Sequence, residues 1–260
     1  MAERVRARVF GEVAGDYDRF RPSYPPELVD DTLRYAGIDR KSSRRAVLDV
    51  GAGTGKATIA FAERGMAVTA VEPDVAMASV LRERIAGDLD IRVVASSFED
   101  FVADQPYQLL VSGQAWHWTD PAVRWERAAA ALAPGGALAL FWNHESIADT
   151  VARKRIIEAH RELAPSVELD PDPIDDETVA TAWPYDEMVA RSEFADVDSR
   201  VYHWSRTIPA ASYVAMLSTH SAYRILDAPQ RDAILSAVAD RLGEHVDLGM
   251  DTIVYFARRV

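Results

Sequence analysis

The stretch Val47-Leu48-Asp49-Val50-Gly51-Ala52-Gly53-Thr54-Gly55-Lys56-Ala57-Thr58 decides the fold. An apolar run ends in an acid and then breaks into glycines at every second position. After the glycines, apolar residues recur at helix-like intervals. This order predicts a strand, a glycine loop and a helix. The loop suits a ligand because glycine lets the backbone approach closely, and a helix N-terminus directs its free N–H groups at whatever the loop holds.

The spacing of the glycines separates three kinds of nucleotide loop. A phosphate loop of the form G-x-x-x-x-G-K-[ST] needs glycine where Val50 stands and Ser or Thr where Ala57 stands. A dinucleotide loop, G-x-G-x-x-G, needs its third glycine where Lys56 stands. The pattern that remains is D-x-G-x-G-x-G. The alternative is that the glycines only form a tight turn from strand to helix and bind no ligand. This form resembles the first motif of the class I S-adenosylmethionine-dependent methyltransferases.

The resemblance implies a doubly wound, mostly parallel seven-stranded α/β sheet, a Rossmann-like fold. It also implies that the glycine loop passes beneath the methionine and ribose parts of S-adenosylmethionine, the methyl donor that becomes S-adenosylhomocysteine. The cofactor contacts that it implies in this stretch are Asp49, Gly51, Ala52, Gly53 and Gly55.

A second acid ends the next apolar run. Residues 66–71 are apolar and partly β-branched, and Glu72-Pro73-Asp74 follows. An acid about 20 residues beyond a glycine loop is where a ribose diol is held, because the carboxylate oxygens can accept from both hydroxyls. Glu72, with Pro73 beside it, is therefore a candidate cofactor residue. The alternative is that this acidic segment only starts a helix, with Asp74 as its N-cap. Both roles can hold together, with Glu72 on the ligand and Asp74 on the helix.

Two further segments carry the resemblance to the cofactor site. Residues 14–25, with Tyr17 and Arg21, resemble the N-terminal lid of methyltransferase-11 type enzymes. The resemblance implies that Tyr17 closes over the cofactor and that Arg21 meets a carboxylate; ordinary packing is the alternative for Tyr17. After the strand at 91–95 the family usually carries an acid for the adenine amino group. In this sequence Ser97 and Phe98 take its place. Ser97 can form a hydrogen bond with the adenine ring, and Phe98 can cover the ring.

The block Gln114-Ala115-Trp116-His117-Trp118 bears on the reaction. It follows a strand and resembles the subgroup that includes trans-aconitate methyltransferase-like proteins. The resemblance implies that Gln114 faces the methionine end of the cofactor and that Trp116, His117 and Trp118 line the space towards the substrate. His117 is the catalytic candidate, as a base for a hydroxyl acceptor or as a shape residue for a carboxylate. The alternative is that the tryptophans are core residues and His117 is a buried histidine.

The C-terminal third adds candidates for an anionic acceptor. Arg224 and Arg21 suit a carboxylate, since guanidinium can bind it with two hydrogen bonds, and His220 lies near Arg224 in the sequence. Apolar residues at helical spacing around them also fit simple packing. His144 and His160 show no paired ligand spacing, so we expect no metal.

Composition limits the possible partners. The chain has 260 residues, no cysteine and a formal net charge of −12. Nucleic-acid binders usually carry a basic surface, so a nucleic-acid substrate is disfavoured. No apolar run approaches the roughly 20 residues of a membrane span, and the N-terminus has no apolar segment typical of a secretory signal. We therefore expect a cytoplasmic protein with a small-molecule acceptor; the sequence leaves its oligomeric state open.

Strands and helices alternate along the chain, as in a parallel sheet covered by helices. Expected strands are 46–50, 67–72, 91–95, 109–112, 137–142, 198–204 and 252–257. Expected helices are 56–64, 75–86, 121–133, 147–163, 209–219 and 228–242, with an exposed loop at 165–176. We expect one domain over 1–260: a helical lid in 1–40, a cofactor-binding core in 41–143 and a substrate-side region in 144–260, whose cap helices at 209–242 precede the last strand.

The sequence thus predicts methyl transfer to an oxygen of a small molecule, with a carboxylate preferred over a hydroxyl. Two alternatives stay open. One is an NAD(P)-dependent oxidoreductase on a similar sheet. The other is a protein that binds S-adenosylmethionine without turnover.

Overall fold

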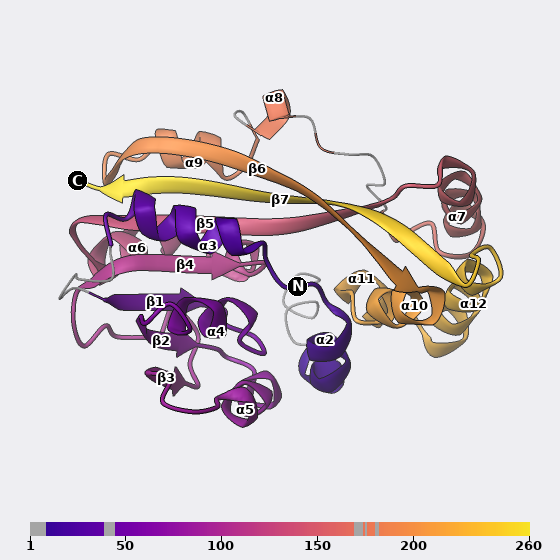
Figure 1. The fold of residues 1–260 in the computed structure, drawn as a ribbon, viewed down its shortest axis with the longest axis horizontal. Helices are drawn as coiled ribbons and strands as arrows, with labels where there is room; N and C mark the ends of the chain where they lie inside the picture. The colour runs from indigo at the N-terminus through magenta and orange to yellow at the C-terminus, as the bar shows by residue number, and fades with distance from the viewer. Residues whose placement is uncertain (1–8, 39–44, 169–173, 175, 180–181) are drawn as a thin grey trace. The chain divides into compact units, whose positions relative to one another are not determined.

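The computed structural model describes residues 9–38, 45–168, 174, 176–179 and 182–260. Parts of the expected lid and of the expected 165–176 loop lie outside these residues. The seven strands are β1 (Ala46–Val50), β2 (Ala67–Val71), β3 (Ile91–Val94), β4 (Tyr107–Gly113), β5 (Leu132–Ile147), β6 (Phe194–Pro209) and β7 (His245–Arg259). They form one sheet in the order β3-β2-β1-β4-β5-β7-β6 (Figure 1).

The sheet is doubly wound, as expected. β1 pairs in parallel with β2 and with β4, β2 with β3, and β4 with β5. The arrow of β7 points opposite to those of β1 and β4, so the sheet is mixed (Figure 1). The strand order reverses between β1 and β4, and ligands on such sheets bind beyond the carboxyl ends of the strands at this point.

Helices cover both faces of the sheet. Those described are η1 (Gly11–Val13), α2 (Ala14–Phe20), α3 (Pro26–Tyr35), α4 (Lys56–Ala62), α5 (Val75–Arg84), η2 (Trp116–Trp118), α6 (Arg124–Ala131), α7 (Thr150–Leu163), α8 (Asp176–Val179), α9 (Tyr185–Val189), α10 (Ala210–Ser218), α11 (Ser221–Arg224) and α12 (Ala228–Ala239). The expected cap helices correspond to α10, α11 and α12.

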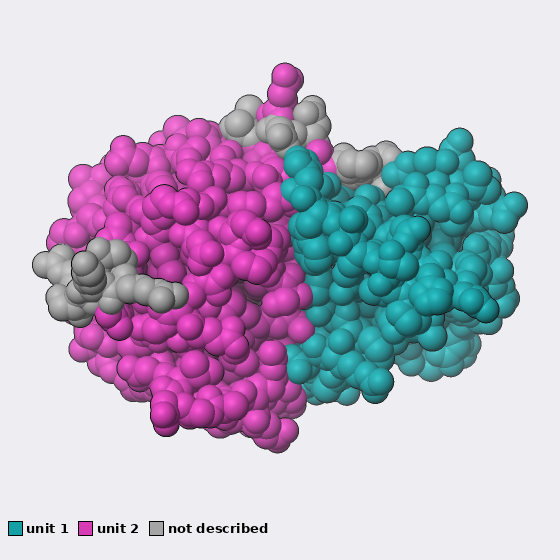
Figure 2. All heavy atoms as spheres, in the orientation of Figure 1, with its two compact units in different colours: residues 1–22, 144–173, 203–251 teal, residues 23–143, 174–202, 252–260 magenta. Residues whose placement is uncertain are grey.

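The chain divides into two compact units (Figure 2). Unit 1 comprises Met1–Pro22, His144–Pro173 and His203–Asp251, and unit 2 comprises Ser23–Asn143, Ile174–Tyr202 and Thr252–Val260. Each unit has its own apolar core, and α7, α10 and α12 contribute to that of unit 1. The glycine loop belongs to unit 2, and the cap helices belong to unit 1.

The core of unit 2 explains why the opening stretch is a strand. Leu48 and Val50 are buried in one apolar cluster, and Val47 is buried in another. Successive side chains of a strand point to opposite faces, so β1 is covered on both faces. A nearly continuous apolar run is typical of such a central parallel strand.

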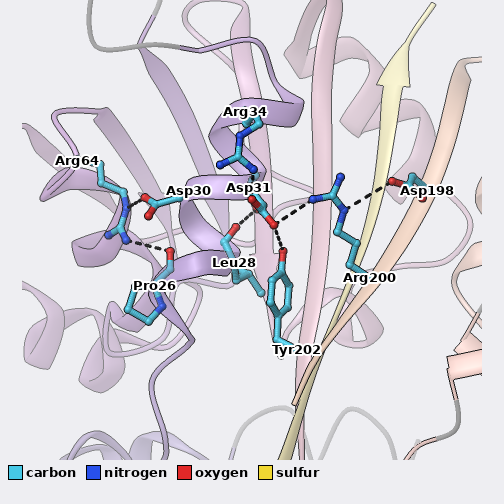
Figure 3. A network of polar contacts seen from close by, with 10 residues as sticks. Pro26, Leu28, Asp30, Asp31, Arg34, Arg64, Asp198, Arg200 and Tyr202 are labelled. Atoms are coloured by element: carbon cyan, nitrogen blue, oxygen red, sulfur yellow. Dashed lines mark hydrogen bonds and ion pairs between the residues drawn. The ribbon is translucent and has the colours of Figure 1, made fainter. Parts of the chain in front are cut away.

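Polar contacts attach α3 to the rest of unit 2 (Figure 3). Oδ2 of Asp31 accepts hydrogen bonds from Nη1 of Arg200 and from the hydroxyl of Tyr202, each at 3.0 Å. On the other side of α3, Arg64 pairs with Asp30 and donates to the carbonyl of Pro26. The helix is therefore tied both to β6 and to the segment after α4.

Three strands are longer than the sequence analysis expected. β5, β6 and β7 extend beyond the expected 137–142, 198–204 and 252–257. In β7, Val246, Leu248 and Met250 are buried and alternate with more exposed residues, a period-2 pattern that was present in the sequence and missed.

Residues 134–136, which lie between the expected helix at 121–133 and the expected strand at 137–142, form a bulge inside β5. Tyr107 of β4 pairs with Leu132, but Leu109 pairs with Ala137. More residues therefore lie between Leu132 and Ala137 than between Tyr107 and Leu109 on the facing strand. Extra residues in one strand of a pair define a bulge. Gly135, at φ +73°, supplies the left-handed backbone that the bulge requires.

Candidate functional site

The glycine loop has the backbone that its sequence predicts. Gly51, Gly53 and Gly55 have φ of +69°, +57° and +89°, values that favour glycine. A Cβ on Gly51 would collide with the Cβ of Ala115, and one on Gly55 with the side chain of Leu81. The loop therefore packs closely against the segment after β4 at Gly51 and against α5 at Gly55, and Ala52 within the loop is buried.

Asp49 lies buried directly before this loop. Its Oδ2 accepts a hydrogen bond from Oγ1 of Thr58 at 2.5 Å. Its Oδ1 is buried and has no hydrogen-bond partner among the described residues. Burial raises the pKa of Asp49 to about 6, against the opposing effect of the Thr58 hydrogen bonds. A buried acceptor without a donor is costly, so this oxygen suits a ligand that brings one.

Glu72 is buried at the tip of β2 and bonded to two backbone N–H groups. Oε2 accepts from Gly53 at 2.7 Å, and Oε1 accepts from Asp74 at 2.8 Å. Burial raises the pKa of Glu72 to about 7, although these hydrogen bonds lower it. A carboxylate has about four lone-pair sites, so each oxygen can still accept a ligand hydroxyl. Asp74 caps α5 as expected, accepting from Ala76 and Met77.

The residues expected at the adenine end differ in exposure. The hydroxyl of Ser97 donates to Asp100 at 2.8 Å and accepts from the backbone of Asp100 at 3.1 Å, which leaves one lone pair. Pro73 is exposed beside Glu72. Phe98 is buried in the core, with its ring 5.8 Å from that of Trp116. Covering of the adenine ring by Phe98 stays a prediction.

Gln114 has a strained backbone at the end of β4. Its φ is +60°, unusual for a residue other than glycine. Its backbone N–H donates to Phe141 at 2.9 Å, and its Nε2 donates to the carbonyl of Asn143 at 3.1 Å. Strain of this kind clusters at functional sites, and the bonds to β5 hold Gln114 in this conformation.

His117 is a neutral imidazole with a defined tautomer. Its Nδ1 lies 3.2 Å from Nε1 of Trp142. An indole N–H can only donate, so Nδ1 must be the acceptor and Nε2 carries the proton. Desolvation of the ring, and then the charge of Arg124, lower the pKa of His117 to about 4, although the residue retains exposed surface. Such a ring is a weak base at neutral pH.

The two tryptophans beside His117 lie in different surroundings. Trp116 is fully buried between Phe98 and Trp125, as the alternative of core packing predicted. Trp118 is half-buried, and its ring centroid lies 4.5 Å from that of His117. Trp142 was not among the residues predicted for the site, although its place at the carboxyl end of an expected strand could have indicated it.

The remaining candidates belong to unit 1. The guanidinium of Arg21 lies 5.3 Å from the ring centroid of Tyr17, and its Nε donates to Oγ1 of Thr219 at 2.8 Å. Arg224 forms an ion pair with Glu12. Closure of Tyr17 over the cofactor involves residues of different units and stays a prediction.

Glu145 is a charged residue of unit 1 that the sequence analysis missed. Its Oε1 lies 3.1 Å from Nε2 of His220. Burial raises the pKa of Glu145, but His220, Arg21 and His144 together lower it to about 2. Burial and the charge of Arg21 lower the pKa of His220 in spite of Glu145. No motif marks Glu145, since only the fold brings it to His220 and Arg21.

The described residues bear on metal binding and on membrane insertion. Within that part of the chain, no group of His, Cys, Asp and Glu side chains could hold a metal ion. No helix in the same residues is both long and apolar enough to cross a bilayer.

Comparisons with known proteins agree with this arrangement. A family described as a methyltransferase domain matches residues 47–136. An uncharacterized methyltransferase of Mycobacterium tuberculosis is 31% identical over 236 residues, which are 91% of this chain and 86% of the relative. A Saccharomyces cerevisiae protein, provisionally named an S-adenosylmethionine-dependent methyltransferase, is 29% identical over 131 residues, 48% of this chain and 43% of that protein.

A solved structure shares the fold. The chain resembles a candidate type II methyltransferase from Anaeromyxobacter dehalogenans with a TM-score of 0.65 and 20% sequence identity, covering 92% of this chain and 98% of that one. The mycobacterial relative matches almost the whole chain, and the glycine cradle, Asp49 and Glu72 fit a cofactor that carries hydrogen-bond donors. The chain belongs to the class I S-adenosylmethionine-dependent methyltransferases.

Proposed function

We propose that this enzyme transfers the methyl group of S-adenosylmethionine to an oxygen of a small-molecule acceptor, with a carboxylate preferred over a hydroxyl. One observation carries the preference. His117 has its Nδ1 occupied by Trp142, and its pKa is lowered to about 4. A hydroxyl acceptor benefits from a base whose pKa lies near the working pH. A carboxylate is already ionised and needs none.

Unit 2 supplies the proposed cofactor site. The unpartnered Oδ1 of Asp49 accepts from a donor of the methionine part, and the remaining lone pairs of Glu72 accept from the ribose hydroxyls. The last lone pair of Ser97 is left for the adenine amino group. The backbone of Gly51 and Gly53 is the part of the loop that we assign to cofactor contact, and Ala52, Gly55, Pro73, Phe98 and Gln114 stay further candidates.

The reaction asks the protein mainly for position. S-adenosylmethionine supplies an activated methyl group on a sulfonium sulfur, so the cofactor carries the difficult chemistry. The chain must hold the acceptor in line with that group at roughly 3–3.5 Å and exclude water. Gln114, fixed by its bonds to β5, and the His117 ring are the residues that we assign to this task.

Unit 1 supplies proposed contacts for an acidic acceptor. Arg21 uses its Nε for Thr219, and its charge also acts on Glu145. We assign its two terminal nitrogens to a carboxylate of the acceptor. Arg224 already pairs with Glu12, which is exposed, so a stronger ligand can replace that partner. We retain Tyr17, Arg21, His220 and Arg224 as candidates for closure and acceptor binding.

The first test is a thermal-shift titration with S-adenosylmethionine, S-adenosylhomocysteine and NAD(P). A ligand at about 100 times its Kd stabilises the fold by roughly 2.7 kcal/mol, so only the sulfur compounds should raise Tm. A shift with NAD(P) alone would contradict the site.

The second test measures S-adenosylhomocysteine release with matched sets of carboxylic acids, alcohols, phenols and amines. Turnover of acids supports the proposal. Turnover confined to amines overturns the oxygen assignment, and cofactor binding without turnover of any set supports the inactive alternative.

A further inference from the structure

Four neighbouring ring side chains form an aromatic face on unit 2. We define it as His117, Trp118, Trp142 and Trp183. The ring of His117 lies 4.5 Å from Trp118 and 6.4 Å from Trp142, and Trp142 lies 5.4 Å from Trp183, between centroids. His117 and Trp183 are exposed, and Trp118 and Trp142 are half-buried. Exposed clusters of large apolar side chains often mark binding sites.

A buried charge fixes one end of this face. The guanidinium of Arg124 is 5.3 Å from the ring centroid of Trp183, and its Nη2 donates to Glu187 at 2.8 Å. Glu187 also accepts from the indole of Trp125 at 2.7 Å. Arg124 is 5% exposed, so Trp183 contacts a buried guanidinium that is held by an ion pair.

The other end is fixed by the hydrogen bond from Trp142 to His117. The indole needs the lone pair of Nδ1, and that lone pair disappears when the imidazole is protonated. Protonation of His117 would therefore break the bond and leave two donors facing each other. Trp142 thus keeps the ring neutral, with the Nε2 proton available to a ligand.

The aromatic face adjoins the proposed cofactor site through the backbone. Ala115, two residues before His117, lies so close to Gly51 that any side chain on Gly51 would collide with it. Gln114, held in its strained conformation, comes directly before Ala115. The segment that carries His117 and Trp118 therefore adjoins the loop that we propose for the methyl donor.

We propose that Trp142 is a positioning residue that holds His117 as an Nε2–H donor, and that the aromatic face binds the methyl acceptor as a flat, conjugated molecule whose oxygen accepts this hydrogen bond. The inference rests on the proposed function and adds the class of acceptor. Aromatic rings prefer other π-systems in offset or edge-to-face contact. The acceptor's second oxygen, or a neighbouring carbonyl, is the partner that Nε2 suits.

The tautomer is tested first, without cofactor. Histidine-selective ¹⁵N NMR of the full chain, with His117→Gln to assign the signal, shows which nitrogen is protonated. We expect protonated Nε2 and bare Nδ1 from about pH 6 to pH 8. Trp142→Phe keeps a ring but removes the donor, and it should raise the pKa of His117 by up to about one unit. Trp204→Phe, in unit 1, is the matched control and should change nothing.

Binding is tested with two acids of equal charge, benzoate and cyclohexanecarboxylate, followed by NMR at His117 and the Trp142 indole with and without S-adenosylhomocysteine. Benzoate should bind about fivefold more tightly, because only it is flat and aromatic. His117→Gln, which keeps a donor, should retain benzoate, and His117→Ala should weaken it about fivefold.

Three results overturn the proposal: a charged or Nδ1-protonated His117 at neutral pH, a pKa unchanged by Trp142→Phe, or benzoate that fails to perturb His117 and Trp142 at millimolar concentration. Loss of S-adenosylhomocysteine binding with these signals intact would instead contradict the cofactor site alone.

Discussion

Glu72 accepts a hydrogen bond from the backbone N–H of Gly53 at 2.7 Å and so ties the tip of β2 to the glycine loop after β1. Its second oxygen accepts from Asp74, the cap of α5. One buried carboxylate therefore shapes the loop and, with its remaining lone pairs, faces the proposed ribose position. The two roles can be separated experimentally.

Glu72→Ala should weaken S-adenosylhomocysteine binding by tens-fold or more, as expected for the loss of about 2–3 kcal/mol of hydrogen bonding to a charged group. Calorimetric titration measures this. Glu63→Ala, an exposed acid in the same unit, is the control and should bind normally. Unchanged affinity in a folded Glu72→Ala protein would mean that Glu72 only shapes the loop.

The stability of the ligand-free protein should depend on the ionisation of Asp49. Its pKa is about 6 in the folded chain against an ordinary value of 3.8. A raised pKa gives stability that is fully present below about pH 4 and is lost as pH rises through 6. The side chain of Asp49→Asn does not titrate in this range. The free energy of unfolding of this variant should therefore fall by about 1–2 kcal/mol less than that of the parent between about pH 5 and pH 8. Urea denaturation at each pH measures the difference, and parallel curves would contradict it.

Gly51→Ala should destabilise the fold and abolish cofactor binding. The new Cβ meets Ala115, and φ of +69° is unfavourable for alanine. Overpacking typically costs about 1–3 kcal/mol, so Tm should fall by several degrees. Gly15→Ala is the matched control, because a methyl group on Gly15 would have no neighbouring atom within 4 Å and the residue lies in α2. It should stabilise the chain by about 0.5–1 kcal/mol.

His117→Gln should keep kcat/KM for an acidic acceptor within a few-fold of the parent, because glutamine replaces the Nε2–H donor. A general base contributes about 10²–10⁴-fold, so a loss of that size would restore His117 as a base. The pH profile of the parent gives a second check. With a pKa near 4, His117 should add no inflection between about pH 6 and pH 8.

Local patterns were sufficient for much of the fold. The glycine spacing after Val50 and the acid after Val71 predicted two strand ends and their helices correctly, because glycine, helix caps and apolar periodicity act within a few residues. The longer course of β7 was missed, although Val246, Leu248 and Met250 alternate. The bulge around Gly135 could not be predicted, since it depends on the register with β4.

The same distinction applies to the site. The sequence by itself determined the glycine loop and the acid at Glu72, because these follow from backbone rules that hold wherever the motif occurs. The class of cofactor came from the resemblance of that motif to a known family. Only the tertiary structure decided that Asp49 has a buried oxygen without a donor, that Trp116 is core, and that Trp142 sets the tautomer of His117. Burial, pKa and hydrogen-bond partners depend on residues distant in sequence, and folding alone brings these together.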